Sequence, residues 1–127
     1  MSCIWIIDDD EDIREVITYA LESEGYEVYG FDDADDALRS LAELSLKNFP
    51  GLILVDYLMP KVDGLEFINR FREKWGSRTA IALCSGMGSI DEEIPSGIIE
   101  LNKPIELDEL LHTAKLFTNP QGQDLVF

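Results

Sequence analysis

The sequence contains few basic residues for its size. Ten Lys and Arg stand against 26 Asp and Glu, so the 127-residue chain carries a formal net charge of −16. Proteins bind the phosphate backbone of nucleic acids through clustered Lys and Arg, and a chain this acidic repels that backbone. Direct binding to nucleic acid is therefore not expected.

Cysteines and long apolar runs are also scarce. Cys3 and Cys84 are too few for a disulfide framework, and each lies in a short apolar run, where a lone cysteine usually behaves as a small buried side chain. The apolar start, residues 1–7, has no basic residues and meets Asp8 too early to be a signal peptide or a membrane span. We expect a cytoplasmic protein without membrane insertion, in which both cysteines are reduced.

Five short runs rich in Ile, Leu and Val have the length of β-strands. Three of them, IWII, LILV and IALC, are almost wholly apolar, which is typical of strands that helices cover on both faces of a parallel sheet. The predicted strands are Cys3–Ile7, Glu27–Phe31, Leu52–Val55, Thr79–Cys84 and Ile98–Leu101.

Between the strands, apolar residues recur at helical spacing. In the first helix they are Ile13, Val16, Ile17, Ala20 and Leu21, which share one face at 3.6 residues per turn. Similar patterns predict helices over residues 34–41, 64–75 and 107–114.

The segment between the fourth and fifth strands has a different composition. Residues 87–97 include several glycines and Pro95, so we expect an irregular connection with at most a turn or two of helix. Apart from this segment, strands and helices alternate along the whole chain. The alternation predicts an α/β fold with a parallel sheet, right-handed crossovers and helices on both faces.

Polar residues follow four of the predicted strands: Asp8 and Asp9 the first, Asp56 the third, Ser85 the fourth and Lys103 the fifth. Ligands of open parallel sheets bind at the carboxyl ends of the strands. Three carboxylates repel one another unless a cation offsets them, and oxygen ligands of this kind favour Mg²⁺ over a fully caged Ca²⁺. Lysine and serine could contact phosphoryl oxygens, which makes Asp56 a candidate nucleophile.

Four segments resemble, in order and spacing, the response-regulator receiver domain, the CheY-like phosphoacceptor module of two-component signalling. They are IIDDDEDIRE, LILVDYLMPKVDGLEF, ALCSG and LNKP, and the resemblance extends from about Cys3 to Phe117. It implies a single-domain, flavodoxin-like (βα)5 fold with strand order 2-1-3-4-5. The receiver domain would comprise residues 1–118, followed by a short C-terminal tail at 119–127.

The resemblance also implies a signalling domain rather than an enzyme. Asp56 would accept a phosphoryl group from a histidine kinase, a histidine phosphotransfer protein or a small phosphodonor, and the change would alter binding to an unknown downstream protein. Asp8, Asp9, an oxygen of Asp56 and the backbone carbonyl of Leu58 would bind Mg²⁺, for which Mn²⁺ could substitute.

The same resemblance assigns the remaining site residues. Ser85 and Lys103 would contact the phosphoryl group, and the peptide bond before Pro104 is often cis in this family. Leu58 and Met87 are apolar at positions near the acceptor and the hydroxyl, which predicts slow loss of the phosphoryl group to water.

Two features depart from the family pattern. Glu100 stands at the switch position, where receivers commonly have Tyr or Phe, and a carboxylate cannot reproduce the inward packing of an aromatic ring. Ser85 and Lys103 are only 18 positions apart, roughly one helical turn fewer than the family norm. We therefore expect the signal to leave by a different surface from that of most receivers.

Three alternatives compete with the receiver domain. Asp8, Asp10 and Asp12 fit the beginning of a calcium-binding loop, but the rest of the pattern fails, because Ile13 replaces the required glycine and Tyr19 stands where the bidentate Glu belongs. Asp8 would be the nucleophile of a haloacid-dehalogenase-type phosphatase, which normally needs a longer chain and leaves Asp56 unexplained. A degenerate receiver that binds a partner without phosphorylation is the third.

Overall fold

A five-stranded parallel sheet forms the centre of the protein, in a computed structural model that describes residues 3–86, 90 and 92–118. The sheet has the order β2-β1-β3-β4-β5, as the family resemblance implied. Its strands are β1 (Cys3–Ile7), β2 (Glu27–Phe31), β3 (Leu52–Asp56), β4 (Ala80–Gly86) and β5 (Ile99–Lys103).

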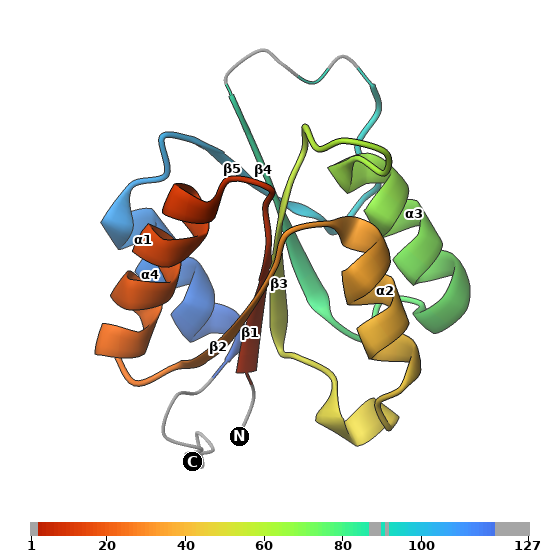
Figure 1. The fold of residues 1–127 in the computed structure, drawn as a ribbon, viewed down its shortest axis with the longest axis horizontal. Coiled ribbons are helices and arrows are strands. Elements are labelled where there is room, and N and C mark those ends of the chain that lie inside the picture. Colours follow the sequence, from red (N-terminus) through yellow and green to blue (C-terminus); the bar gives the residue numbers. More distant parts are fainter. Residues whose placement is uncertain (1–2, 87–89, 91, 119–127) are drawn as a thin grey trace.

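Helices cover both faces of the sheet. The helices are α1 (Glu11–Ser23), α2 (Ala34–Ala42), α3 (Gly64–Trp75) and α4 (Leu107–Phe117), with a short 3-10 helix η1 (Leu46–Asn48). Figure 1 shows α1 and α4 on one face and α2 and α3 on the other. None of the described residues between β4 and β5, which are residues 90 and 92–98, is helical, so no helix alternates with the strands in the described part of that connection.

Aspartates begin the first three helices. Asp10, Asp33 and Asp63 have extended backbones, and their carboxylates accept hydrogen bonds from N–H groups two or three residues further on. These bonds satisfy donors that a helix leaves unpaired at its start, and the negative charge suits the helix dipole. At the other end of α1, Gly25 has a φ of 95°, as expected for the residue after a helix terminus.

The central strands carry the core. β3 is buried at every position, and β1 at every position after Cys3. The α1 face is only partly buried: Ile17 and Leu21 lie in the core, whereas Val16 is 68% exposed. The sequence pattern was therefore wrong in placing Val16 on the buried face.

Strands β4 and β5 both run two residues further than predicted. Parallel pairing continues between Ser85 and Asn102 and between Gly86 and Lys103. Ser85 and Lys103 therefore lie within strands rather than in the loops that follow them, and the regular ladder fixes their backbones. No helix among the described residues is long and apolar enough to cross a membrane.

Candidate functional site

Three carboxylates meet at the carboxyl edge of the sheet. Oxygen atoms of Asp8, Asp9 and Asp56 all lie within 4.8 Å of one another. Asp8 and Asp9 follow β1, and Asp56 ends the neighbouring strand β3. Asp8 and Asp56 are buried and Asp9 is exposed, so the cluster opens to solvent on one side. The structure thus brings together the three acidic residues that the sequence indicated.

Lys103 supplies the positive charge in this cluster. Its Nζ lies 2.7 Å from Oδ1 of Asp56 and 3.6 Å from Oδ2 of Asp8. The peptide bond between Lys103 and Pro104 is cis, as the family resemblance indicated. One ammonium group therefore faces two buried carboxylates, and the balance of charge remains negative.

The pKa values of the pair reflect this imbalance. Burial raises the pKa of Asp56 above its ordinary value, and the charges of Asp8 and Asp9 add to the effect, although the hydrogen bond from Lys103 opposes it. Burial by itself would lower the pKa of Lys103, but its hydrogen bond to Asp56 and the two nearby carboxylates raise it on balance. Lys103 is therefore cationic at neutral pH, and a further cation would favour ionised Asp56.

The donor set fits a hard divalent cation. All three acidic groups offer oxygen ligands within one small volume, and Mg²⁺ binds proteins through few carboxylates together with water or phosphate oxygens. One oxygen of Asp8, Oδ1, already accepts the N–H of Asp10 at 2.9 Å. The other oxygen of Asp8 and the carboxylates of Asp9 and Asp56 are the groups that would bind the ion.

Ser85 lies on β4, the strand next to the one that ends at Asp56. It is 8% exposed and stands one residue beyond Cys84, the register partner of Asp56. The other predicted neighbours are less defined. Leu58 lies in the loop between β3 and α3 with a side chain that is 65% exposed, and the role of its carbonyl stays a prediction. Met87 lies outside the described residues.

Gly64 allows α3 to begin directly against β3, the strand that ends at Asp56. A Cβ atom at this position would lie 2.6 Å from the backbone oxygen of Asp56 and 2.7 Å from Cδ1 of Leu83. The N–H of Gly64 also donates to the carbonyl of Tyr57 at 2.9 Å. A glycine is thus required at position 64, because α3 begins too close to β3 for a side chain to fit.

Glu100 faces solvent rather than a core. It pairs in register with Leu83, whose side chain packs with α3, so Glu100 lies on the same face of the sheet. No described residue between β4 and β5 forms a helix that could cover it. An aromatic side chain would be exposed here, which explains why a carboxylate is compatible with this position.

Two side-chain hydrogen bonds beside the site were missed by sequence reasoning. Arg14 donates from Nη1 to the carbonyl oxygen of Asp8 at 2.7 Å, and the hydroxyl of Tyr57 lies 3.1 Å from Oε1 of Glu92. The only signal for Arg14 was that it is the one basic residue of α1. For Tyr57 the sequence contained no signal other than its position directly after Asp56.

The calcium-loop alternative is excluded by the start of α1. The helix begins at Glu11, and the Asp10 carboxylate accepts the N–H groups of Asp12 and Ile13. A twelve-residue binding loop therefore cannot form from Asp8 onward.

Comparisons with known proteins agree with this geometry. Residues 4–115 match the family model described as the response regulator receiver domain. The transcriptional regulatory protein FixJ of Bradyrhizobium diazoefficiens is 34% identical over 111 residues, which cover 84% of this chain and 52% of FixJ. The response regulator receiver protein CpdR of Brucella abortus is 31% identical over 116 residues, 88% of this chain and 92% of CpdR.

Solved structures show the same fold. A CheY-like response regulator receiver domain protein from Methanospirillum hungatei has a TM-score of 0.78 at 20% identity, over 96% of this chain and 98% of that one. The chain spans about half the length of several curated relatives that it matches, FixJ among them.

Proposed function

Because the chain belongs to the response-regulator receiver domain family of two-component signalling, we propose that Asp56 accepts a phosphoryl group while Asp8, Asp9 and Asp56 hold Mg²⁺. One observation carries this proposal. The buried carboxylate of Asp56 lies within 4.8 Å of two other carboxylates and 2.7 Å from Lys103 Nζ. This combination provides a nucleophile, a cation site and a positive charge for phosphoryl oxygens.

Phosphoryl transfer from a phosphohistidine needs little covalent help from the protein. An oxygen of the Asp56 carboxylate attacks phosphorus, the new P–O bond forms as the P–N bond to the donor imidazole breaks, and the departing imidazole takes up a proton. When bound, Mg²⁺, or Mn²⁺ in its place, neutralises the carboxylates and the phosphoryl oxygens. The backbone carbonyl of Leu58 is the fourth proposed protein ligand.

Lys103 and Ser85 act on the transferred group. The ammonium of Lys103, which pairs with Asp56 before the reaction, donates to a phosphoryl oxygen afterwards. The Ser85 hydroxyl donates to another. Both residues lie in strands, so little reorganisation is needed as charge develops on these oxygens.

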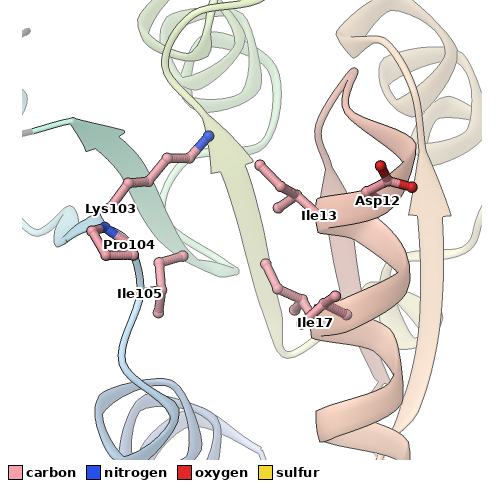
Figure 2. Close-up of a pocket in the computed structure, with 7 residues that line it drawn as sticks. Asp12, Ile13, Ile17, Lys103, Pro104 and Ile105 are labelled. Atoms are coloured by element: carbon pink, nitrogen blue, oxygen red, sulfur yellow. The ribbon is translucent and has the colours of Figure 1, made fainter.

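The incoming donor protein has an apolar surface to bind beside Lys103. A groove of about 530 Å³ lies between α1 and the segment after β5. Figure 2 shows Ile13 and Ile17 of α1 on one side and Ile105 on the other. The lining residues are Asp12, Ile13, Val16, Ile17, Lys103, Pro104 and Ile105.

A phosphohistidine can reach Asp56 only if its protein contacts the surface around the site. We propose that the histidine kinase or histidine phosphotransfer protein places apolar side chains in this groove and basic ones against Glu11 and Asp12. Val16, 68% exposed in the groove, tests this. Val16→Lys should slow transfer from a histidine kinase while leaving phosphorylation by acetyl phosphate unchanged. Equal slowing with both donors would contradict the docking site.

Labelling identifies the acceptor. Wild-type protein incubated with acetyl phosphate and Mg²⁺ should gain one acid-stable, base-labile phosphoryl group, and Asp56→Ala should gain none. Asp32→Asn is the matched control, because Asp32 belongs to a second acidic group with Asp33 and Asp36 and is exposed. Label on Asp56→Ala, or on Asp8, would refute this assignment and favour the phosphatase alternative.

The receiver domain comprises residues 1–118 in this proposal, with 119–127 as a tail, and phosphorylation changes binding to a downstream protein. The net charge of −16 supports a protein target rather than direct nucleic-acid binding. A phosphorylation-independent role is not favoured, because acceptor, carboxylates and lysine are all present together.

The output surface differs from that of receivers with a switch aromatic. Glu100 is exposed, and the described residues between β4 and β5 form no helix, so the aromatic inward-to-outward movement has no counterpart. Amide exchange with and without beryllofluoride, a phosphoryl mimic, tests the alternative route. Protection changes should extend over α3. Changes confined to residues 92–98 and β5, the region where most receivers have their fourth helix and fifth strand, would contradict the alternative route.

A further inference from the structure

Arg14 contacts the backbone between two of the site carboxylates. Its Nη1 donates to the carbonyl oxygen of Asp8 at 2.7 Å in a partly buried setting. That oxygen belongs to the peptide group that joins Asp8 to Asp9. Fixing the plane of this peptide constrains the directions in which both carboxylates leave the backbone.

Other hydrogen bonds hold the same residue from its remaining sides. The N–H of Asp8 donates to the carbonyl of Phe31 at 3.0 Å, and Oδ1 of Asp8 accepts the N–H of Asp10 at 2.9 Å. With the Arg14 contact, Asp8 is held by β2 through Phe31, by the N-cap Asp10 and by α1 through Arg14. Without such restraints, the repulsion between neighbouring carboxylates would favour their rotation away from each other.

The absence of a side chain at Gly30 leaves room for the stem of Arg14. A Cβ atom at Gly30 would lie 3.5 Å from Cδ and 3.8 Å from Nε of Arg14, which is ordinary van der Waals distance. A methyl group therefore fits, whereas a larger side chain would meet the arginine stem. The stem of Arg14 thus packs over Gly30 of the edge strand β2, and its guanidinium group reaches Asp8 at the end of β1.

The charge of Arg14 cannot be what helps a metal to bind. A cation beside the site repels Mg²⁺, so the Coulomb effect of removing it would be tighter binding. We propose that Arg14 is a positioning residue, which holds the Asp8–Asp9 peptide so that both carboxylates face one ion. This inference rests on the proposed function. Positioning by Arg14 should strengthen Mg²⁺ binding, whereas the charge of Arg14 should weaken it, so the two effects have opposite signs.

Calorimetric titration of the full chain with Mg²⁺ separates the two effects. Arg14→Met keeps the apolar stem and should weaken binding about tenfold, the loss typical of groups that orient metal ligands. Arg14→Lys keeps one hydrogen-bond donor, so its Mg²⁺ affinity should lie between those of the wild type and Arg14→Met. Arg39→Met removes the same charge from an exposed ion pair with Asp36 on α2 and should bind like the wild type.

Gly30 supplies a second, independent test. Gly30→Val leaves the arginine in place but crowds its stem, and valine suits an edge strand, so the fold should persist. It should weaken Mg²⁺ binding in the wild-type background and have no further effect in Arg14→Met, because both changes act through one contact. Gly30→Ala should have no effect in either.

The outcomes distinguish this inference from the function on which it rests. Wild-type protein that binds Mg²⁺ no more tightly than Arg14→Met would overturn the role of Arg14 alone. Effects of Arg14→Met and Gly30→Val that simply add would also overturn it. Wild-type protein that takes up no Mg²⁺ would defeat the proposed metal site, and the inference with it.

Discussion

The hydroxyl of Tyr57 donates to the carboxylate of Glu92, with 3.1 Å between the two oxygens. Tyr57 directly follows Asp56 and is 7% exposed, whereas Glu92 belongs to the irregular connection between β4 and β5. Further along that connection, Arg72 of α3 donates to the carbonyl of Ser96 at 2.6 Å. Hydrogen bonds therefore attach this connection to the residue after Asp56, through Glu92, and to α3, through Ser96.

Tyr57→Phe should loosen this connection. Losing one hydrogen bond should lower the free energy of unfolding by about 1 kcal/mol. Amide exchange should accelerate over residues 92–98 more than in β3. Exchange measured by mass spectrometry, with urea unfolding followed by fluorescence, gives both quantities.

The partner residue provides the controls for this bond. Glu92→Ala should reproduce the effect of Tyr57→Phe, Glu92→Gln should retain most of the stability, and the double variant should lose little more than either single one. Tyr19→Phe removes a hydroxyl from a side chain that is 76% exposed and should be neutral. Additive losses in the double variant would show that the two groups act separately.

Gly64→Ala should distort the site itself. The added Cβ would lie 2.6 Å from the Asp56 carbonyl oxygen, so α3 must move away from β3 at a cost of about 1–3 kcal/mol. Mg²⁺ affinity should fall as well, because Asp56 shifts. Gly86→Ala is the control, since a Cβ there meets no atom of the described residues within 4 Å. Equal stability of the two variants in urea would contradict the close approach.

The elements that depend on local sequence were predictable. β1 and β2 have the predicted bounds, because a run of apolar residues ended by polar ones defines a buried strand in a parallel sheet. Asp33 and Asp63 cap helices through N–H groups of residues three positions on, so these caps depend only on local sequence. The site carboxylates were predictable because strand ends share one edge.

Features that depend on distant partners were not predictable. Ser85 and Lys103 look like loop residues, but pairing between β4 and β5 extends through them. The helical spacing places Val16 on the apolar face of α1, yet its side chain is 68% exposed. The partner of Arg14 is a backbone carbonyl, and that of Tyr57 lies 35 positions away, so neither leaves a pattern in the sequence.

Asp56→Asn should stabilise the metal-free protein at neutral pH. Burial and the neighbouring carboxylates raise the pKa of Asp56 above its ordinary 3.8. Such a group contributes stability below the unfolded-state pKa and loses it as the pH rises through the folded-state pKa. Ionised Asp56 therefore costs stability at pH 7, and an amide avoids that cost.

The gain should depend on pH and on metal. A stabilisation of about 1 kcal/mol would raise Tm by roughly 4 °C in a domain of this size. It should shrink as the pH falls through the raised pKa of folded Asp56 toward the ordinary value of 3.8, because the wild-type carboxyl also becomes neutral there. Saturating Mg²⁺ should remove or reverse it, because the ion favours the wild-type carboxylate. Thermal scans of the wild type and Asp56→Asn at pH 7 and at low pH, with and without Mg²⁺, test both dependences. A gain in Tm that does not change with pH would contradict the role of ionisation.

Cys84 should resist alkylation in the folded protein. Burial raises the pKa of its thiol to about 12, and the side chain is 4% exposed in β4, opposite Asp56 in register. The thiolate is the reactive form, so at pH 8 a thiol of this pKa should be roughly a thousandfold less ionised than one of pKa 9. In a Cys3→Ser protein, where Cys84 is the only thiol, iodoacetamide should label slowly in buffer and rapidly in urea. Native labelling at the unfolded rate would mean that β4 opens far more often than a central strand should, because such strands open only with much of the fold.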